Sequence, residues 1–133
     1  MSPALSTLGD VTEHIRFGAI SLDCADPDVL ADFWAAVVDG EVAFRSDTFD
    51  AVKAGSLWLT AVKVDNYQAP TWPGDDTPKQ MHLDLAVSDL AEAEREVLAL
   101  GATKATTQPS PASYLVFLDP AGHPFCLSTN IPE

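Results

Sequence analysis

The sequence predicts an α+β fold of two tandem βαβββ modules, whose sheets form a cupped, partly open barrel with the helices outside. Three observations predict it. The chain repeats itself when position 22 is laid over position 83, a shift of 61 residues. Each copy shows the same order of strand and helix signals. The length of 133 residues suits a single hydrophobic core.

The repeat is gapless over the part of each copy that joins a strand to a helix. Residues 22–40 read LDCADPDVLADFWAAVVDG, and residues 83–101 read LDLAVSDLAEAEREVLALG. Five positions are identical between the copies. They are Leu22/Leu83, Asp23/Asp84, Ala25/Ala86, Asp28/Asp89 and Gly40/Gly101. We therefore expect two modules of the same architecture in one chain.

Each predicted helix has a polar residue that can cap its start and a glycine that can end it. Asp26 or Asp28 and Gly40 have these roles in the first helix, and Ser88 or Asp89 and Gly101 in the second. Pro27 suits a first helical turn, because its missing N–H would have no helical partner there. Both glycines are expected to take the left-handed backbone conformation.

Short alternating runs after each glycine predict three strands per module. The strands are expected at 41–45, 49–54 and 56–64 in the first copy, and at 101–106, 113–119 and 123–129 in the second. Residues 65–79 are rich in Pro, Asp and Gly and predict a connector. We thus expect a polar N-terminal arm at 1–13 and one domain at 14–133, with module one at about 16–64 and module two at about 80–129.

The two-residue period of a strand predicts which side chains face the trough between the sheets. Met81, Leu83, Leu85 and Val87 are expected beneath a helix, with His82 and Asp84 on the opposite face. By the same alternation, the predicted trough residues of the other strands are Ala19, Ser21, Asp23, Trp58, Thr60, Val62, Pro124, Cys126 and Ser128. Phe17 could line the entrance, and Trp72 of the connector could fold over it. Trp34 is expected in the core, and His123 in a structural turn.

The charge of the chain limits its partners. Twenty acidic and seven basic residues give a net charge of −13 at pH 7. A field of this sign repels phosphate backbones and anionic lipid, so neither nucleic acid nor a membrane surface is an expected partner. No apolar run reaches the roughly 20 residues of a membrane helix, and the N-terminus lacks a signal-peptide pattern. Cys24 and Cys126 fall on opposite faces of their strands, which argues against a disulfide and favours the cytoplasm.

Three segments resemble the glyoxalase-like branch of the vicinal oxygen chelate superfamily, which includes bleomycin-resistance proteins and dioxygenases. They are ISLDCADPDVLADFWAAVV, MHLDLAVSDLAEAEREVLALGA and VFLDPAGHPFCL, and the resemblance covers about residues 16–129. It implies the tandem βαβββ fold with one concave site for a small molecule. It also implies a homodimer whose sites use both chains.

Metal-dependent members of this superfamily hold a divalent ion with side chains from the first, fourth, fifth and eighth strands. Those positions fall here on Ala19 or Ser21, on Thr60, on His82 and on Cys126. His82 is a strong ligand and Cys126 a possible thiolate, whereas the first two positions offer no usual ligand. We therefore expect no cofactor and no metal. If a metal does bind, His82 and Cys126 would hold it.

Two classes of function follow from the resemblance. The first is metal-independent binding of a small organic molecule, cationic or aromatic, by sequestration as in bleomycin resistance or as metabolite binding. The expected ligand-binding residues are Phe17, Ala19, Ser21, Trp58, Thr60, Trp72, His82, Cys126 and Ser128. The alternative is a lyase, isomerase or dioxygenase that uses His82 with a non-standard metal site, or His82 and Asp84 as a metal-free acid and base. A third possibility is a regulatory or dimerisation module with a vestigial trough. Glyoxalase I activity is not expected, because most metal-ligand positions carry no ligand.

Overall fold

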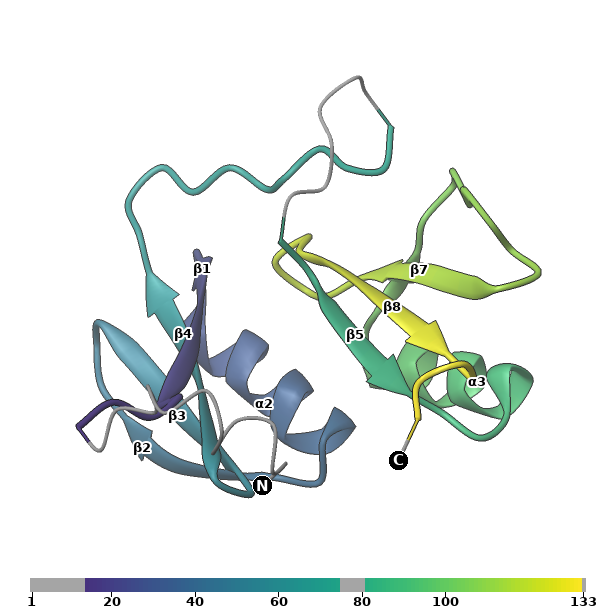
Figure 1. Ribbon diagram of the computed structural model, residues 1–133. Coiled ribbons are helices and arrows are strands. Elements are labelled where there is room, and N and C mark those ends of the chain that lie inside the picture. Colours follow the sequence, from purple (N-terminus) through teal and green to yellow (C-terminus); the bar gives the residue numbers. More distant parts are fainter. Residues whose placement is uncertain (1–13, 75–80, 133) are drawn as a thin grey trace.

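The computed structural model describes residues 14–74 and 81–132 and contains the βαβββ order twice (Figure 1). The predicted N-terminal arm therefore lies outside the described residues. Module one consists of β1 (Ala19–Cys24), α2 (Pro27–Val37), β2 (Glu41–Arg45), β3 (Phe49–Ala54) and β4 (Leu57–Lys63). Module two consists of β5 (Leu83–Ala86), α3 (Leu90–Leu100), β6 (Thr103–Lys104), β7 (Tyr114–Leu118) and β8 (Pro124–Ser128).

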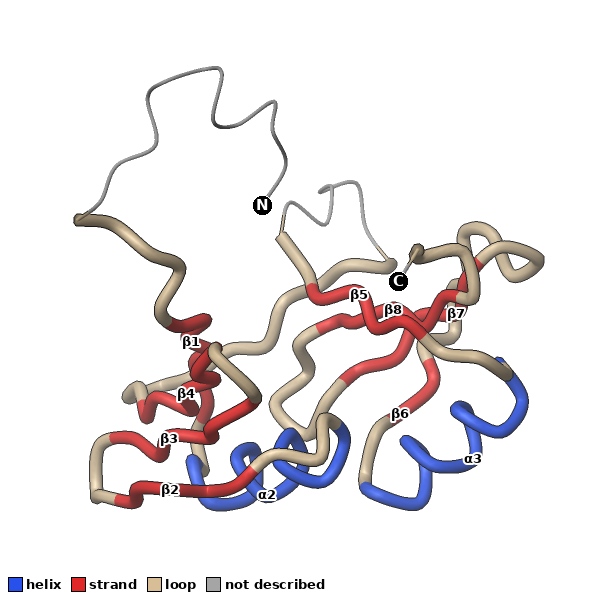
Figure 2. Tube along the Cα trace, turned by 60° about the horizontal axis from the view of Figure 1, so that its bottom comes forward, coloured by secondary structure: helices blue, strands red, loops and turns tan. Residues whose placement is uncertain are grey.

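The two four-stranded sheets have the same topology. Their strand orders are β1-β4-β3-β2 and β5-β8-β7-β6. The first strand of each module lies at an edge and pairs in parallel with the last, and the remaining pairs are antiparallel. This arrangement confirms the predicted fold class, with sheets that are cupped and not closed into a barrel. Figure 2 shows both helices on the same side of the strands.

Side-chain caps fix where the helices begin. The Asp26 carboxylate accepts hydrogen bonds from the backbone N–H groups of Asp28 and Val29, at 3.1 and 3.4 Å. Asp89 does the same for Glu92 at 3.0 Å. A carboxylate at this position satisfies amide groups that have no partner within the helix. Of the alternatives in the sequence, Asp26 and Asp89 are thus the caps.

The two helices end differently, although both are followed by a glycine. Gly101 has the expected left-handed backbone, with φ of 119°. In module one, however, Asp39 takes that conformation, with φ of 53°, so the expectation for Gly40 was wrong. Gly40 is required for another reason. A Cβ atom at this position would lie 2.7 Å from the backbone oxygen of Lys53.

One hydrophobic core joins the two modules. Trp34 of α2 lies edge-on to Phe125 of β8, with ring centroids 5.1 Å apart, and the two side chains are 2% and 0% exposed. The Trp34 indole N–H donates to the Asp119 carboxylate at 2.9 Å, so its polar atom is satisfied inside the core. The prediction that Trp34 packs in the core is confirmed. The modules therefore share their interior.

The strand alternation holds with two corrections. Phe125 and Leu127 are buried as expected. Met81 was expected beneath a helix but is 91% exposed, because β5 begins only at Leu83. The strand predicted at 101–106 is limited to Thr103 and Lys104. Both corrections lie at element ends, where sequence patterns constrain structure least.

Candidate functional site

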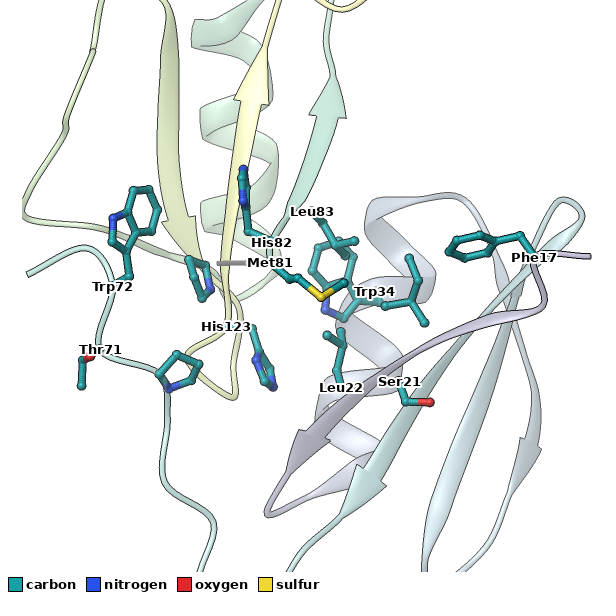
Figure 3. Close-up of a pocket in the computed structure, with 13 residues that line it drawn as sticks. Phe17, Ser21, Leu22, Trp34, Thr71, Trp72, Met81, His82, Leu83 and His123 are labelled. Atoms are coloured by element: carbon teal, nitrogen blue, oxygen red, sulfur yellow. The ribbon is translucent and has the colours of Figure 1, made fainter. Parts of the chain in front are cut away.

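A cavity of about 590 Å³ opens between the two modules (Figure 3). Its lining comes from β1, α2, the connector and the N-terminal ends of β5 and β8. The apolar lining residues are Phe17, Ile20, Leu22, Trp34, Pro70, Trp72, Met81, Leu83 and Pro124. Polar side chains come from Ser21, Thr71, His82 and His123. The volume and the mostly apolar lining with a few polar groups are typical of small-molecule sites.

His82, Asp84 and Cys126 form a compact cluster on module two. His82 Nε2 lies 3.0 Å from Asp84 Oδ1, and one ligand atom from each of the three residues lies within 4.8 Å of the others. The cluster follows from the sheet register, because Asp84 and Cys126 are directly paired on neighbouring strands. His82 and Asp84 point to the same face because they are two residues apart.

Cys126 faces away from the main core, as the alternation predicted, but it is only 1% exposed. It packs with Ala105 and Val116 in a second small cluster, against which Trp72 and Tyr114 lie. The thiol is therefore covered and does not line the cavity. Cys24, like Cys126, is only 1% exposed, and the two are not joined by a disulfide.

Trp72 forms the part of the cavity wall that the connector supplies. Its ring lies 6.2 Å from the His82 ring, at an interplanar angle of 34°. The sequence placed Trp72 over the opening, and the described part of the connector does bring it beside His82. Residues 75–79 of the connector lie outside the described residues.

The predicted trough residues of module one form a separate group. Thr60 Oγ1 and Ser21 Oγ are 2.6 Å apart on the paired strands β4 and β1. The Trp58 ring lies under the Lys53 ammonium group, 5.1 Å from the ring centroid. Ser21 lines the cavity, but its hydroxyl points away from His82 in Figure 3. Of the nine predicted ligand-binding residues, the cavity brings together Phe17, Ser21, Trp72 and His82. Ala19, Trp58, Thr60, Cys126 and Ser128 are not part of its lining.

His123 lines the cavity, although the sequence suggested only a structural turn. The turn is present, since Asp119 Oδ1 accepts from the backbone N–H groups of Ala121 and His123. The imidazole has contacts of its own. Its Nε2 lies 2.6 Å from the backbone oxygen of Asp23 and 3.2 Å from the Tyr67 hydroxyl. The only sequence signal for this role was a histidine at the first position of the strand predicted at 123–129.

Burial makes two nearby titratable groups poor acids. It raises the pKa of Cys24 to about 11, with Asp26 adding to the effect, and that of Tyr67 to about 12, with Asp119 adding to it. Both groups are neutral at pH 7. The Cys24 thiol is accordingly not an activated nucleophile.

Comparison with known proteins places the chain in a family. The glyoxalase-like domain family matches residues 19–128. The chain belongs to this family. No curated protein sequence matches it. The three glyoxalase-like segments noted above all lie within the matched range.

Solved structures with this fold include two fosfomycin resistance proteins named FosX. The one from Mesorhizobium loti has a TM-score of 0.63 and 15% identity, and the match covers 91% of this chain and 94% of that one. A variant of the one from Listeria monocytogenes, solved with Mn(II) and a dihydroxypropylphosphonic acid, has a TM-score of 0.63 and 16% identity, with coverage of 91% and 93%. A glyoxalase-related enzyme from Fulvimarina pelagi has a TM-score of 0.58 and 19% identity, with coverage of 85% and 86%. At these identities the likeness shows the fold alone.

The residues present fit only some metals at the position that the family resemblance implies. Ser21 and Thr60 are hydroxyls hydrogen-bonded to each other. His82, Asp84 and Cys126 supply nitrogen, oxygen and sulfur donors. Three such ligands suit a thiophilic ion such as Zn²⁺ with one open position, whereas Mn²⁺ and Mg²⁺ prefer oxygen-rich sites. The cluster therefore fits zinc better than the manganese bound by the Listeria protein.

Proposed function

We propose that the chain binds a small organic molecule in the cavity between its modules, without using a metal. The observation that carries this proposal is the cavity itself, about 590 Å³ in volume and walled by Trp72, Phe17, Leu83 and Met81. Aromatic walls supply a large contact area for a planar ligand, and His82 and His123 supply polar groups that can orient it. The binding would serve sequestration, as in bleomycin resistance, or recognition of a metabolite.

The helices, the net charge and the cysteines bear on the partners and the cellular location of the protein. Among the described residues no helix is both long and apolar enough to cross a membrane. The net charge of −13 disfavours nucleic acid and anionic lipid as partners. Two buried cysteines that are not joined by a disulfide suit a reducing compartment, so we expect the protein in the cytoplasm.

We also propose that the protein is a homodimer, as its family resemblance implies. Phe17, Phe44 and Phe49 are 73%, 50% and 37% exposed in the single chain. Large exposed apolar side chains are typical of surfaces that meet a partner. Sedimentation equilibrium at micromolar concentration should give twice the 14.2 kDa chain mass. A monomer at these concentrations would contradict the proposal.

A ligand screen with two matched tryptophan variants tests the proposed binding site. Metabolites and antibiotics would be screened by thermal shift, and hits measured by calorimetry. Trp72→Ala should weaken binding of a hit by about tenfold or more, which is the loss expected for one buried aromatic contact. Trp58→Ala is the control, because Trp58 is also half-buried but lies outside the cavity lining. An equal effect of both variants, or a screen without hits, would contradict the proposal.

The cluster of His82, Asp84 and Cys126 favours a second candidate, an enzyme acting on a small oxygenated substrate as a lyase, isomerase or dioxygenase. His82 and Asp84 could exchange a proton with a substrate, or the three residues could hold a thiophilic metal. Bound zinc would supply a Lewis acid for a lyase or an isomerase, whereas a dioxygenase would need a redox-active metal in its place. The test is metal analysis of protein purified without chelator or affinity metal. Near-stoichiometric metal that is lost in His82→Ala would support the metal-dependent enzyme. Turnover of a substrate that is unchanged in His82→Ala would exclude both versions.

A further inference from the structure

We propose that His123 is a specificity-determining residue of the cavity, whose Nδ1 accepts a hydrogen bond from the ligand. The cavity then selects aromatic molecules that carry an N–H or O–H donor and are neutral or cationic, and it rejects anions. This inference rests on the proposed function and names the ligand class of the same site.

The partners of His123 Nε2 fix which ring nitrogen carries the proton. The backbone oxygen of Asp23, 2.6 Å away, can only accept a hydrogen bond. The Tyr67 hydroxyl donates its single proton to the Ala121 backbone oxygen at 2.8 Å, so its oxygen is left to accept from Nε2 at 3.2 Å. Nε2 must therefore be the protonated nitrogen. In the neutral ring, Nδ1 then has a lone pair and no proton.

No described residue donates a hydrogen bond to His123 Nδ1. The hydrogen bonds of the His123 ring among residues 14–74 and 81–132 all involve Nε2. The two ring nitrogens lie on different edges of the imidazole, so Nδ1 does not face Asp23 or Tyr67. Because the ring lines the cavity, an acceptor is available to a ligand there. A polar group buried by a ligand without a partner costs free energy, which makes such an acceptor selective for donors.

His82 has a similar arrangement on the neighbouring strand, since it directly precedes β5, and β5 pairs with the β8 strand that His123 precedes. Its Nε2 is held by the Asp84 carboxylate at 3.0 Å, an acceptor when ionised, so Nδ1 is again the nitrogen without a proton in the neutral ring. Its side chain is only 14% exposed. The cavity is therefore lined by two imidazole rings at the N-terminal ends of the neighbouring strands β5 and β8.

The charges around the cavity favour the same ligand class. Among the described residues that line it, none is Lys, Arg, Asp or Glu. An anion placed there would lose its hydration without meeting a cation, at high cost. A cation would be attracted by the field of a protein with charge −13, and Trp72 and Phe17 could face it with their rings.

Three indole probes of similar shape and two isosteric variants test the inference by calorimetry. Tryptamine carries an ammonium donor, indole-3-propionate replaces it by a carboxylate, and indole is neutral with a ring N–H. His123→Gln keeps a side-chain N–H near the Nε2 position but removes the acceptor at Nδ1. His123→Asn keeps an acceptor near Nδ1 and loses the donor to Asp23.

We expect tryptamine to bind at least tenfold tighter than indole-3-propionate. His123→Gln should weaken tryptamine at least tenfold, and His123→Asn by less than threefold. Thermal stability should show the reverse order, with His123→Asn the less stable variant. Unchanged tryptamine affinity in His123→Gln, or tighter binding of indole-3-propionate, would overturn the inference and leave the proposed function standing. If neither these probes nor any library compound bound the wild-type protein, the proposed function itself would fall.

Discussion

At the scale of single residues, Asp50 is a carboxylate that makes stability depend on pH. Its side chain is fully buried, and it shares the Arg45 guanidinium with Asp28, at 3.0 and 3.1 Å from the same Nη1 atom. Burial, and secondly the Asp28 carboxylate, raise the pKa of Asp50 above its ordinary value of 3.8. The folded state therefore binds this proton more tightly than the unfolded state does. The resulting stability is fully present below pH 3.8 and is lost as pH rises through the folded pKa.

Asp50→Asn should remove this pH dependence, because an amide does not titrate. The free energy of unfolding of the variant should increase relative to that of wild type as pH rises from 4 to 8, because only the wild type loses stability in this range. The lowered pKa of Asp28 acts below pH 3.8 and does not interfere in this range. Urea unfolding at several pH values measures the difference. Asp32→Asn is the control, since Asp32 also pairs with Arg45 but is exposed. Parallel curves for wild type and Asp50→Asn would contradict the prediction.

At the scale of elements, Gly40 controls how β2 approaches β3 after α2. A Cβ atom there would lie 2.7 Å from the Lys53 oxygen and 3.1 Å from Val52 Cγ1, and the backbone oxygen cannot move without disturbing the sheet. Gly40→Ala should therefore lower the free energy of unfolding by about 1–3 kcal/mol, the usual cost of overpacking. Gly18→Ala, which would meet no atom within 4 Å, should have little effect in the same urea titration. Equal stability of the two variants would show that the strand pair adjusts.

The sequence predicted these elements well because their signals are local. Caps, glycines and two-residue alternation act within a few positions, so both modules, the buried Phe125 and the neighbouring pair His82 and Asp84 could be inferred. The arrangement between modules depends on contacts that no period encodes. Ser21 and His82 were therefore expected in one trough, yet the Ser21 hydroxyl points away. His123 was missed because its role depends on the Asp23 carbonyl, 100 residues away in sequence.

At the scale of the whole molecule, the shared core predicts that the two modules unfold together. Phe33 and Trp34 of α2 both contact Phe125 of β8, and the Phe125 ring also stacks on Phe117.

Removing the Phe125 side chain leaves a void at the contact between the modules and lowers the free energy of unfolding by about 3–5 kcal/mol. Since the void left by the missing ring borders both modules, Phe125→Ala should destabilise both. The protection of β1 and β7 amides against hydrogen exchange should fall by similar free energies. Phe49→Ala is the matched control, because Phe49 is 37% exposed and its ring contact is with Phe44. If Phe125→Ala weakened protection in β7 and left β1 unchanged, the modules would be independent folding units that only touch. Loss of protection in both strands would mean that the two modules, with the ligand cavity between them, unfold as one cooperative unit.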